Sequence, residues 1–96
     1  MPRASDYSKD FLKDWQRLSR SGRYDMNNLK IVMLLIIAND GPLPAERKDH
    51  ELKGPWKGFR ECHMGGDFLL IYKLDQVSKF EIVVFTRVGT HAELFE

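Results

Sequence analysis

The sequence predicts an α+β domain in which two N-terminal helices pack on one face of a small antiparallel sheet. Two observations support this class. The first part of the chain repeats apolar residues at helical spacing, whereas the second part holds three short apolar runs separated by turn residues. We therefore expect a single domain, 1–96, with a sheet of three or four strands and a short C-terminal helical turn.

The first helix is expected from about Ser8 to Arg20. Ser8 can cap its start, and Phe11, Trp15 and Leu18 recur at steps of four and three residues. A Ser–Gly pair then ends the helix. The outer face is assigned to charged side chains, namely Lys9, Lys13, Asp14 and Arg17.

The second helix is expected from Asp25, which can cap it, to Ala38. Its β-branched residues are also compatible with a strand, but the length of the pattern and the capping residue favour a helix. The stretch 29–37 is apolar nearly all round, so we expect it to be heavily buried. A Gly- and Pro-containing loop follows at 39–44, and 45–56 is interpreted as an ordered connection.

Three strands are expected over 58–63, 67–74 and 80–87, joined by turns at 64–66 and 75–78. The middle run is apolar on both faces, as in a central strand. The tail can close with one helical turn capped by Thr90.

Composition gives little indication of partners, because the formal net charge is only +1. The basic residues are nevertheless clustered, and the candidates for RNA contact are Arg47, Lys48, Lys53, Lys57 and Arg60. No signal-peptide pattern opens the chain, and its longest apolar run, 31–38, is too short to cross a bilayer. We expect a cytoplasmic protein with no membrane contact.

Five chemically active residues fall at predicted strand ends or in the adjoining loops: His50, His63, Asp67, Arg87 and His91. A tight turn is expected to bring His63 opposite Asp67. Taken one by one, such residues are more often surface, turn or ion-pair residues. Together, we expect them to gather on one concave, basic surface.

Two other chemistries are weaker. No pair of histidines has the close spacing of a zinc motif, so neither a metal nor another cofactor is expected. Cys62 neighbours His63 on a strand and must face the other way, so we interpret it as a packing residue.

RNA transesterification fits these residues better, because the substrate's own 2′-hydroxyl attacks the phosphate. The protein then supplies a base, an acid and cations for the developing charge, which His and Arg side chains provide. Phe68 and Phe95 could stack on bases, although core packing is favoured for Phe68.

A family resemblance covers most of the chain. It is carried, in order, by the segments 48–63 (KDHELKGPWKGFRECH), 67–74 (DFLLIYKL) and 87–95 (RVGTHAELF), and weakly by 7–10. Together they resemble YafQ-type toxins, a branch of the RelE/ParE superfamily. Two departures stand out. Phe68 occupies a position where the family often has tryptophan, and 1–6 is too short and polar to be a convincing form of the family's usual first strand. That strand is either trimmed here, or Arg3 to Asp6 pairs poorly at the sheet edge.

The resemblance implies a RelE-like fold and a metal-independent endoribonuclease that cuts mRNA in the A site of the 70S ribosome. It also implies neutralisation by a cognate antitoxin protein. Its implied active site is His50, His63, Asp67, Arg87, His91 and Phe95. We expect Arg87 to clamp phosphate and His91 to be the general acid. Asp67, aided by His63, is the expected base, with His50 contacting phosphate, although either histidine could be the base.

Two alternatives remain open at this point. A ParE-like toxin would have the same fold and would bind DNA gyrase without cleaving nucleic acid. Such a binder does not require three histidines and an aspartate on one surface. A catalytically inactive regulatory partner is the third reading.

Overall fold

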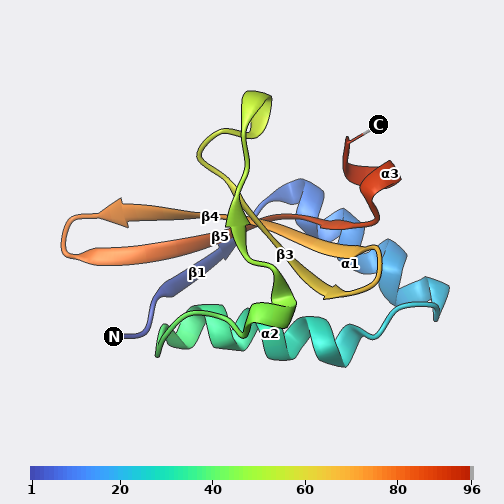
Figure 1. The fold of residues 1–96 in the computed structure, drawn as a ribbon, viewed down its shortest axis with the longest axis horizontal. Helices are drawn as coiled ribbons and strands as arrows, with labels where there is room; N and C mark the ends of the chain where they lie inside the picture. Colours follow the sequence, from blue (N-terminus) through green and yellow to red (C-terminus); the bar gives the residue numbers. More distant parts are fainter. Residues whose placement is uncertain (96) are drawn as a thin grey trace.

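The computed structural model describes residues 1–95, whose arrangement is shown in Figure 1. Its elements are, in chain order, β1 (Ala4–Tyr7), α1 (Lys9–Ser21), α2 (Met26–Ala38), η1 (Ala45–Arg47), β2 (His50–Glu51), η2 (Gly54–Trp56), β3 (Arg60–Gly65), β4 (Phe68–Val77), β5 (Phe80–Gly89) and α3 (His91–Phe95), where η1 and η2 are 3-10 turns. The α+β class predicted from the sequence is confirmed.

Capping side chains set where the two long helices begin, as predicted. Ser8 Oγ and Asp25 Oδ1 each accept a hydrogen bond, at 2.9 Å, from the backbone N–H three residues further on. These N–H groups have no partner inside the helix, so the caps stabilise the first turns. Gly22 ends α1 in the left-handed conformation with φ 68°, which glycine adopts without a steric penalty.

The sheet has five strands in the order β1-β5-β4-β3-β2, so the predicted three or four strands are too few. β1 lies parallel to β5, with Ala4 paired to Ile82, and the other neighbours are antiparallel. The sheet is therefore mixed rather than purely antiparallel. The two additional strands are the edge strands. The prediction left β1 open, and it is exposed throughout; β2, which has only two residues, was missed.

The strand boundaries also differ from the prediction at the second hairpin. β4 continues to Val77, because Asp75 and Gln76 pair with β5 instead of turning, whereas β5 begins at Phe80 as predicted. A two-residue loop joins them, with Ser78 at φ 57°. Figure 1 shows this hairpin extending well beyond the helices.

Both long helices cover the same face of the sheet, as expected. The main core joins Phe11 and Leu18 of α1 to Leu29 and Val32 of α2 and to the inward side chains of the strands. The outer side of α2 is not buried, contrary to the prediction: Ile31, Leu34 and Leu35 are exposed. A helix packed on one layer covers only one of its sides, whatever the composition of the other.

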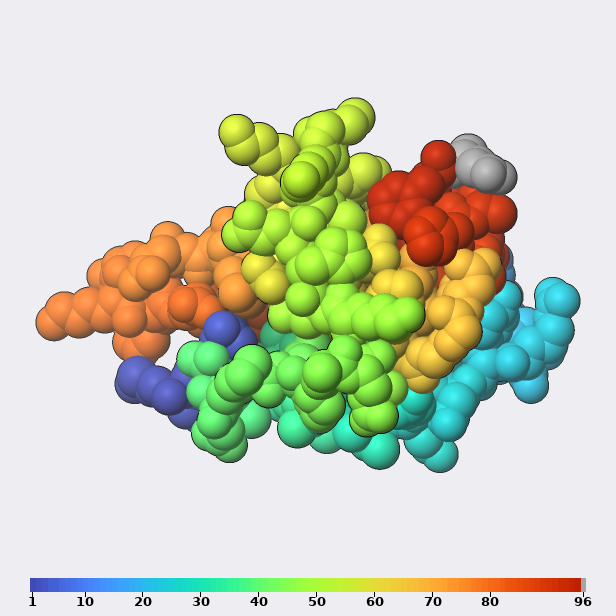
Figure 2. Space-filling view, in the orientation of Figure 1, coloured from blue at the N-terminus to red at the C-terminus, as the bar shows by residue number. Residues whose placement is uncertain are grey.

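A second, smaller core lies on the opposite face of the sheet. Leu69 and Ile71 of β4 pack there against Leu94 of α3 and against partly buried side chains of the 52–59 segment. Trp56 also meets the ring of Phe95 edge-on, with centroids 5.9 Å apart. Figure 2 shows this segment and α3 side by side above the sheet. No helix among residues 1–95 is long and apolar enough to cross a membrane.

Candidate active site

Strand register assigns the predicted site residues to one face of the sheet. Cross-strand partners have their side chains on the same face. One row of partners crosses four strands and consists of His50, Glu61, Ile71 and Arg87. His63 pairs with Leu69 in a second row. Because Ile71 and Leu69 belong to the smaller core, both rows face α3 and not the long helices.

The remaining acid–base residues join this face through α3. The helix follows β5 directly, and its first residue, His91, reaches the β3–β4 turn. There Asp67 Oδ1 lies 3.0 Å from both the backbone nitrogen and Nδ1 of His91. The sequence predicted that Asp67 would lie opposite His63, and this prediction is wrong. A bulge shifts the register and pairs His63 with Leu69.

We use the term histidine face for the surface formed by His50, His63, Asp67, Arg87, His91 and Phe95. The strand register, the Asp67–His91 contact and the ring contacts place these residues on the same side of the sheet. Phe95 is partly exposed, and its ring lies 5.5 Å from that of His91. A base could therefore stack on Phe95 next to the imidazole.

Hydrogen bonds from His91 change the acidity of Asp67. The backbone N–H and then the side chain of His91 lower the pKa of the Asp67 carboxyl below its ordinary value. The carboxylate is thus ionised at neutral pH, and its pairing with His91 is lost only as the pH falls through that lowered pKa. A general base acting near neutral pH needs the opposite shift. Asp67 is better suited to hold His91 than to accept the substrate's proton.

His50 and His63 form a pair, with ring centroids 6.5 Å apart. His50 Nδ1 lies 2.6 Å from the carbonyl oxygen of Lys48, which favours a proton on Nδ1 and leaves Nε2 as the acceptor in the neutral ring. His63 Nε2 lies 3.2 Å from Glu61 Oε1. Each ring is therefore held by one nitrogen, and the other nitrogen is left for chemistry.

Glu61 was missed in the sequence. Its side chain is 5% exposed and contacts His63 on the same strand. The signal was present, because residues two apart on a strand share a face, and 58–63 was already predicted to be a strand.

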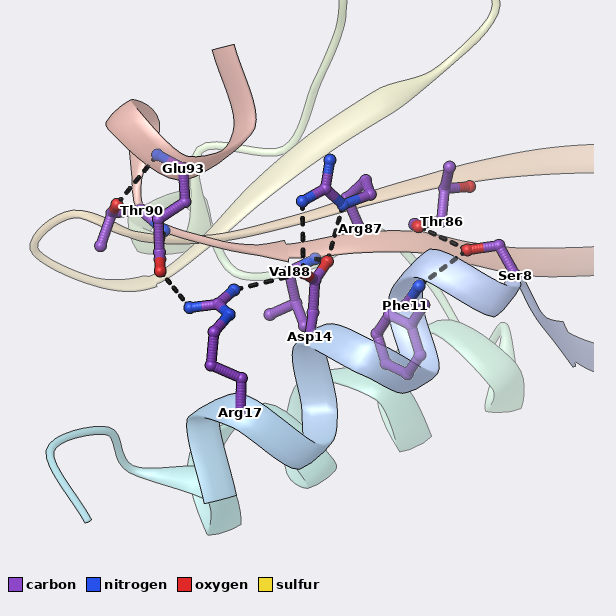
Figure 3. Close-up of polar contacts among 9 residues, drawn as sticks. All are labelled: Ser8, Phe11, Asp14, Arg17, Thr86, Arg87, Val88, Thr90 and Glu93. Carbon is purple, nitrogen blue, oxygen red and sulfur yellow. Dashed lines mark hydrogen bonds and ion pairs between the residues drawn. The ribbon is translucent and has the colours of Figure 1, made fainter. Parts of the chain in front are cut away.

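Arg87 is held by Asp14, the second residue that was missed (Figure 3). Arg87 Nε and Nη2 donate to the Asp14 carboxylate at 2.7 and 3.2 Å. This hydrogen bonding raises the pKa of Arg87, which stays charged. Asp14 was predicted on the outer face of its helix but is buried. It lies three residues after Phe11 and four before Leu18, which is the spacing of the buried stripe.

Two of the five basic candidates are engaged elsewhere. The Arg60 side chain is on the face of the sheet opposite to the histidine face, and its guanidinium pairs with the carboxylate of Asp49 at 3.2 Å. Arg47 Nη2 donates to the side-chain oxygen of Asn28 at 3.1 Å. The exposed candidates are Lys48, Lys53 and Lys57. Lys53 and Lys57 lie on the segment that packs on the smaller core, which is on the same side of the sheet as the histidine face.

Phe68 is in the main core, not on the histidine face. It is 7% exposed, and its ring lies 4.9 Å from that of Tyr24. Because the Phe68 ring is almost fully buried, it leaves no open face on which a base could stack. Phe95 is the remaining aromatic candidate.

Cys62 faces the long helices, away from His63, and is fully buried. Burial raises the pKa of its thiol far above neutral pH, so a thiolate nucleophile is not formed. No group of three His, Cys, Asp or Glu side chains among residues 1–95 is arranged to hold a metal ion.

Replacing Cys62 by serine is expected to leave RNA cleavage within about threefold of the parent, because the side chain lies outside the histidine face. Stability should fall by about 1–3 kcal/mol, since a hydroxyl replaces a thiol among apolar neighbours. Single-turnover cleavage and urea unfolding measure the two effects. Loss of cleavage in a variant that remains folded would instead show that the thiol takes part.

Comparisons with known proteins identify the family to which this chain is similar. The model of a family described as bacterial toxin of type II toxin-antitoxin system, YafQ, matches residues 3–96. A relative from Escherichia coli strain K12, named mRNA interferase toxin YafQ, is 48% identical over 91 residues, which are 94% of this chain and 92% of the relative.

Two solved structures are similar over nearly the whole chain. The crystal structure of YafQ from Escherichia coli BL21(DE3) has a TM-score of 0.84 and 45% identity, covering 98% of this chain and 99% of that one. The toxin chain similar to this one in the Escherichia coli DinJ-YafQ toxin-antitoxin complex has a TM-score of 0.82 and 45% identity, with full coverage of both chains.

Proposed function

The chain belongs to the YafQ family of bacterial toxins of type II toxin–antitoxin systems, and on this basis we propose that it is an mRNA interferase. The observation that carries the proposal is the gathering of three histidines, Asp67 and Arg87 on one face of the sheet. The family match over 3–96 supports one toxin domain.

The proposed reaction uses the RNA as its own nucleophile. The 2′-oxygen forms a bond to the adjacent phosphorus, and the bond from phosphorus to the 5′-oxygen breaks. A base takes the 2′-hydroxyl proton, and an acid gives a proton to the departing 5′-oxygen. The products are a 2′,3′-cyclic phosphate and a free 5′-hydroxyl, so electrons and protons balance without another reactant.

The contacts support the following roles. His91 is the general acid, because Asp67 holds its Nδ1 side and leaves Nε2 to face the RNA. The His50–His63 pair supplies the base, since the lowered pKa of Asp67 makes that carboxylate a poor proton acceptor. Arg87 stabilises the charge that develops on the phosphorane. The initial assignment of the base to Asp67 is therefore replaced in this proposal.

We further propose that the substrate is mRNA in the A site of the 70S ribosome and that a cognate antitoxin neutralises the protein. The name of the K12 relative and the DinJ-YafQ complex support the activity and the partner. A cytoplasmic location belongs to the same proposal, because translating ribosomes are found there.

Purified protein incubated with 70S ribosomes that hold a defined message in register tests the proposal. We expect cleavage within the A-site codon, which mapping of the message ends detects, and no cleavage after a stoichiometric antitoxin is added. The same message without ribosomes is the control for ribosome dependence. An intact message together with inhibited DNA supercoiling by gyrase would instead establish a ParE-like activity.

A further inference from the structure

A chain of charged side chains connects α1 to the C-terminal part of the histidine face (Figure 3). We call it the Asp14 network, and its members are Asp14, Arg17, Arg87 and Glu93. None of these pairings involves the general acid or the base directly. The network nevertheless contacts both elements that carry catalytic groups at this end of the sheet, β5 and α3.

Asp14 is the centre of the network. Its carboxylate accepts hydrogen bonds from four N–H groups. The donors are Nε and Nη2 of Arg87 at 2.7 and 3.2 Å, the backbone nitrogen of Val88 at 3.1 Å, and Nη2 of Arg17 at 3.2 Å. The residue is 5% exposed. A buried carboxylate is costly unless it is fully paired, so this one specifies where its partners lie.

The contact with Asp14 also selects which edge of Arg87 is available. Asp14 occupies the edge formed by Nε and Nη2, so the edge formed by Nη1 and Nη2 is the one that can receive a phosphate. Figure 3 shows the remaining nitrogen turned away from α1. Since a guanidinium has five N–H donors in a rigid plane, fixing one edge fixes the direction of the other.

Arg17 extends the network to α3. It pairs with Asp14 and, through Nη1, with Glu93. Glu93 Oε1 accepts the backbone N–H of Thr90 at 2.8 Å, and the Glu93 N–H donates to Thr90 Oγ1 at 3.3 Å, which is a capping box. A side chain at Gly89 would place its Cβ 2.8 Å from Glu93 Oε1, so the Glu93 carboxylate would have to move from this position.

We propose that Asp14 is the positioning residue of the active site, setting the phosphate-binding edge of Arg87 and, through Arg17 and Glu93, the placement of α3 with His91. The proposal rests on the proposed function and deepens it. The phosphate-binding Arg87 lies on β5 and the general acid His91 lies on α3. Asp14 connects both elements to helix α1 through hydrogen bonds and ion pairs. Small displacements of such groups from their working geometry cost activity steeply.

The test compares Asp14→Asn with Asp10→Asn, a matched change at an exposed position on the same helix. We expect Asp14→Asn to lower single-turnover cleavage at saturating ribosomes by about 10- to 100-fold, with half-saturation changed less than about threefold. Asp10→Asn should cleave within about twofold of the parent. A purely structural role would lower the folded fraction and leave the rate per folded molecule unchanged.

The exchange rate of the Arg87 Nε–H proton, measured by ¹⁵N-edited NMR, is a second measurement that does not depend on cleavage. A hydrogen bond to a buried carboxylate should protect this proton from exchange in the parent. Asp14→Asn should reduce the protection, because one charged acceptor oxygen is replaced by an amide NH2 and the other becomes neutral. Arg17→Gln should leave Arg87 Nε–H protected but loosen α3, seen as faster amide exchange at 91–95, with a smaller loss of cleavage. Arg17 is 44% exposed, so this variant and Glu93→Gln carry the test if Asp14→Asn does not fold.

Unchanged Arg87 Nε–H protection and a rate within about threefold in folded Asp14→Asn would overturn the proposal. If Asp14→Asn does not fold, unchanged α3 exchange and unchanged cleavage in Arg17→Gln and Glu93→Gln would overturn it. A parent protein that cuts no message on ribosomes would instead refute the proposed function. The NMR measurements would still decide whether Asp14 holds Arg87 and α3.

Discussion

Replacing His91 by alanine should slow cleavage of A-site mRNA by about 10²- to 10⁴-fold, the usual contribution of a general acid. The 5′-oxygen is a poor leaving group without a proton, and His91 lies at the helix start where Asp67 holds its ring. Single-turnover rates on programmed ribosomes measure the loss. The fold should survive, because the His91 side chain is exposed and its backbone contact to Asp67 does not depend on it.

A message with sulfur in place of the 5′-oxygen at the cleavage site identifies the acid. Sulfur departs without protonation, so this substrate should restore most of the rate of His91→Ala. Asp67→Asn should also be rescued, because in the structure Asp67 acts through His91. His63→Ala removes one of the two histidines that are proposed to supply the general base. This variant should remain slow on both substrates.

Two other outcomes would revise these roles. If the sulfur substrate rescued His91→Ala but not Asp67→Asn, Asp67 would be the base after all, despite its lowered pKa. If it rescued neither, His91 would not be the acid.

Replacing Arg87 by alanine should have two separate effects. Cleavage should fall by about 10²- to 10³-fold, because a preorganised donor to the phosphorane is lost. The free energy of unfolding should also fall by about 2–3 kcal/mol, because the buried Asp14 carboxylate keeps only Arg17 and Val88 as donors. Urea unfolding and single-turnover cleavage measure the two.

Matched variants separate the effects. Arg87→Lys keeps a charge near Asp14 but loses the planar fork, so it should recover part of the stability and little of the cleavage. Combining Arg87→Ala with Asp14→Asn should recover stability, because the unpaired charge is gone, and should leave cleavage low. Full activity in Arg87→Lys would show that only positive charge is needed at this position.

The helices were predictable because their signals are local. Ser8 and Asp25 each lie three residues before the N–H they cap, and Gly22 follows directly on α1. These interactions depend on neighbours in the sequence and on little else. The exposed outer side of α2 was not predictable from composition, because exposure depends on what packs against the helix.

The edge strands could not be found in the same way. The residues of β1 carry no alternating pattern, and they form a strand because β5, far along the chain, offers a free edge. The two residues of β2 are too few to show any period. Pairing between distant segments depends on the tertiary arrangement, which overrides local propensity.

The site was predictable in part for a related reason. His50, His63 and His91 stand out because histidine suits proton transfer wherever it is placed. Asp14 and Glu61 do not stand out, because a charged residue at a buried position is recognised only when its partner is known. For Asp14 that partner is Arg87, 73 residues away. The spacing of Asp14 from Phe11 and Leu18 fits the buried stripe of α1, but its charge led to its assignment to the outer face.

The parallel pairing of β1 with β5 also determines when this protein can become active during its own synthesis. Ala4 needs Ile82 as its partner, so the sheet closes through contacts of very high sequence separation. The clamp residue and α3 follow still later in the chain. A nascent chain therefore cannot complete the fold co-translationally while its last strand is inside the exit tunnel. The histidine face is therefore assembled only once both β5 and α3 have left the exit tunnel.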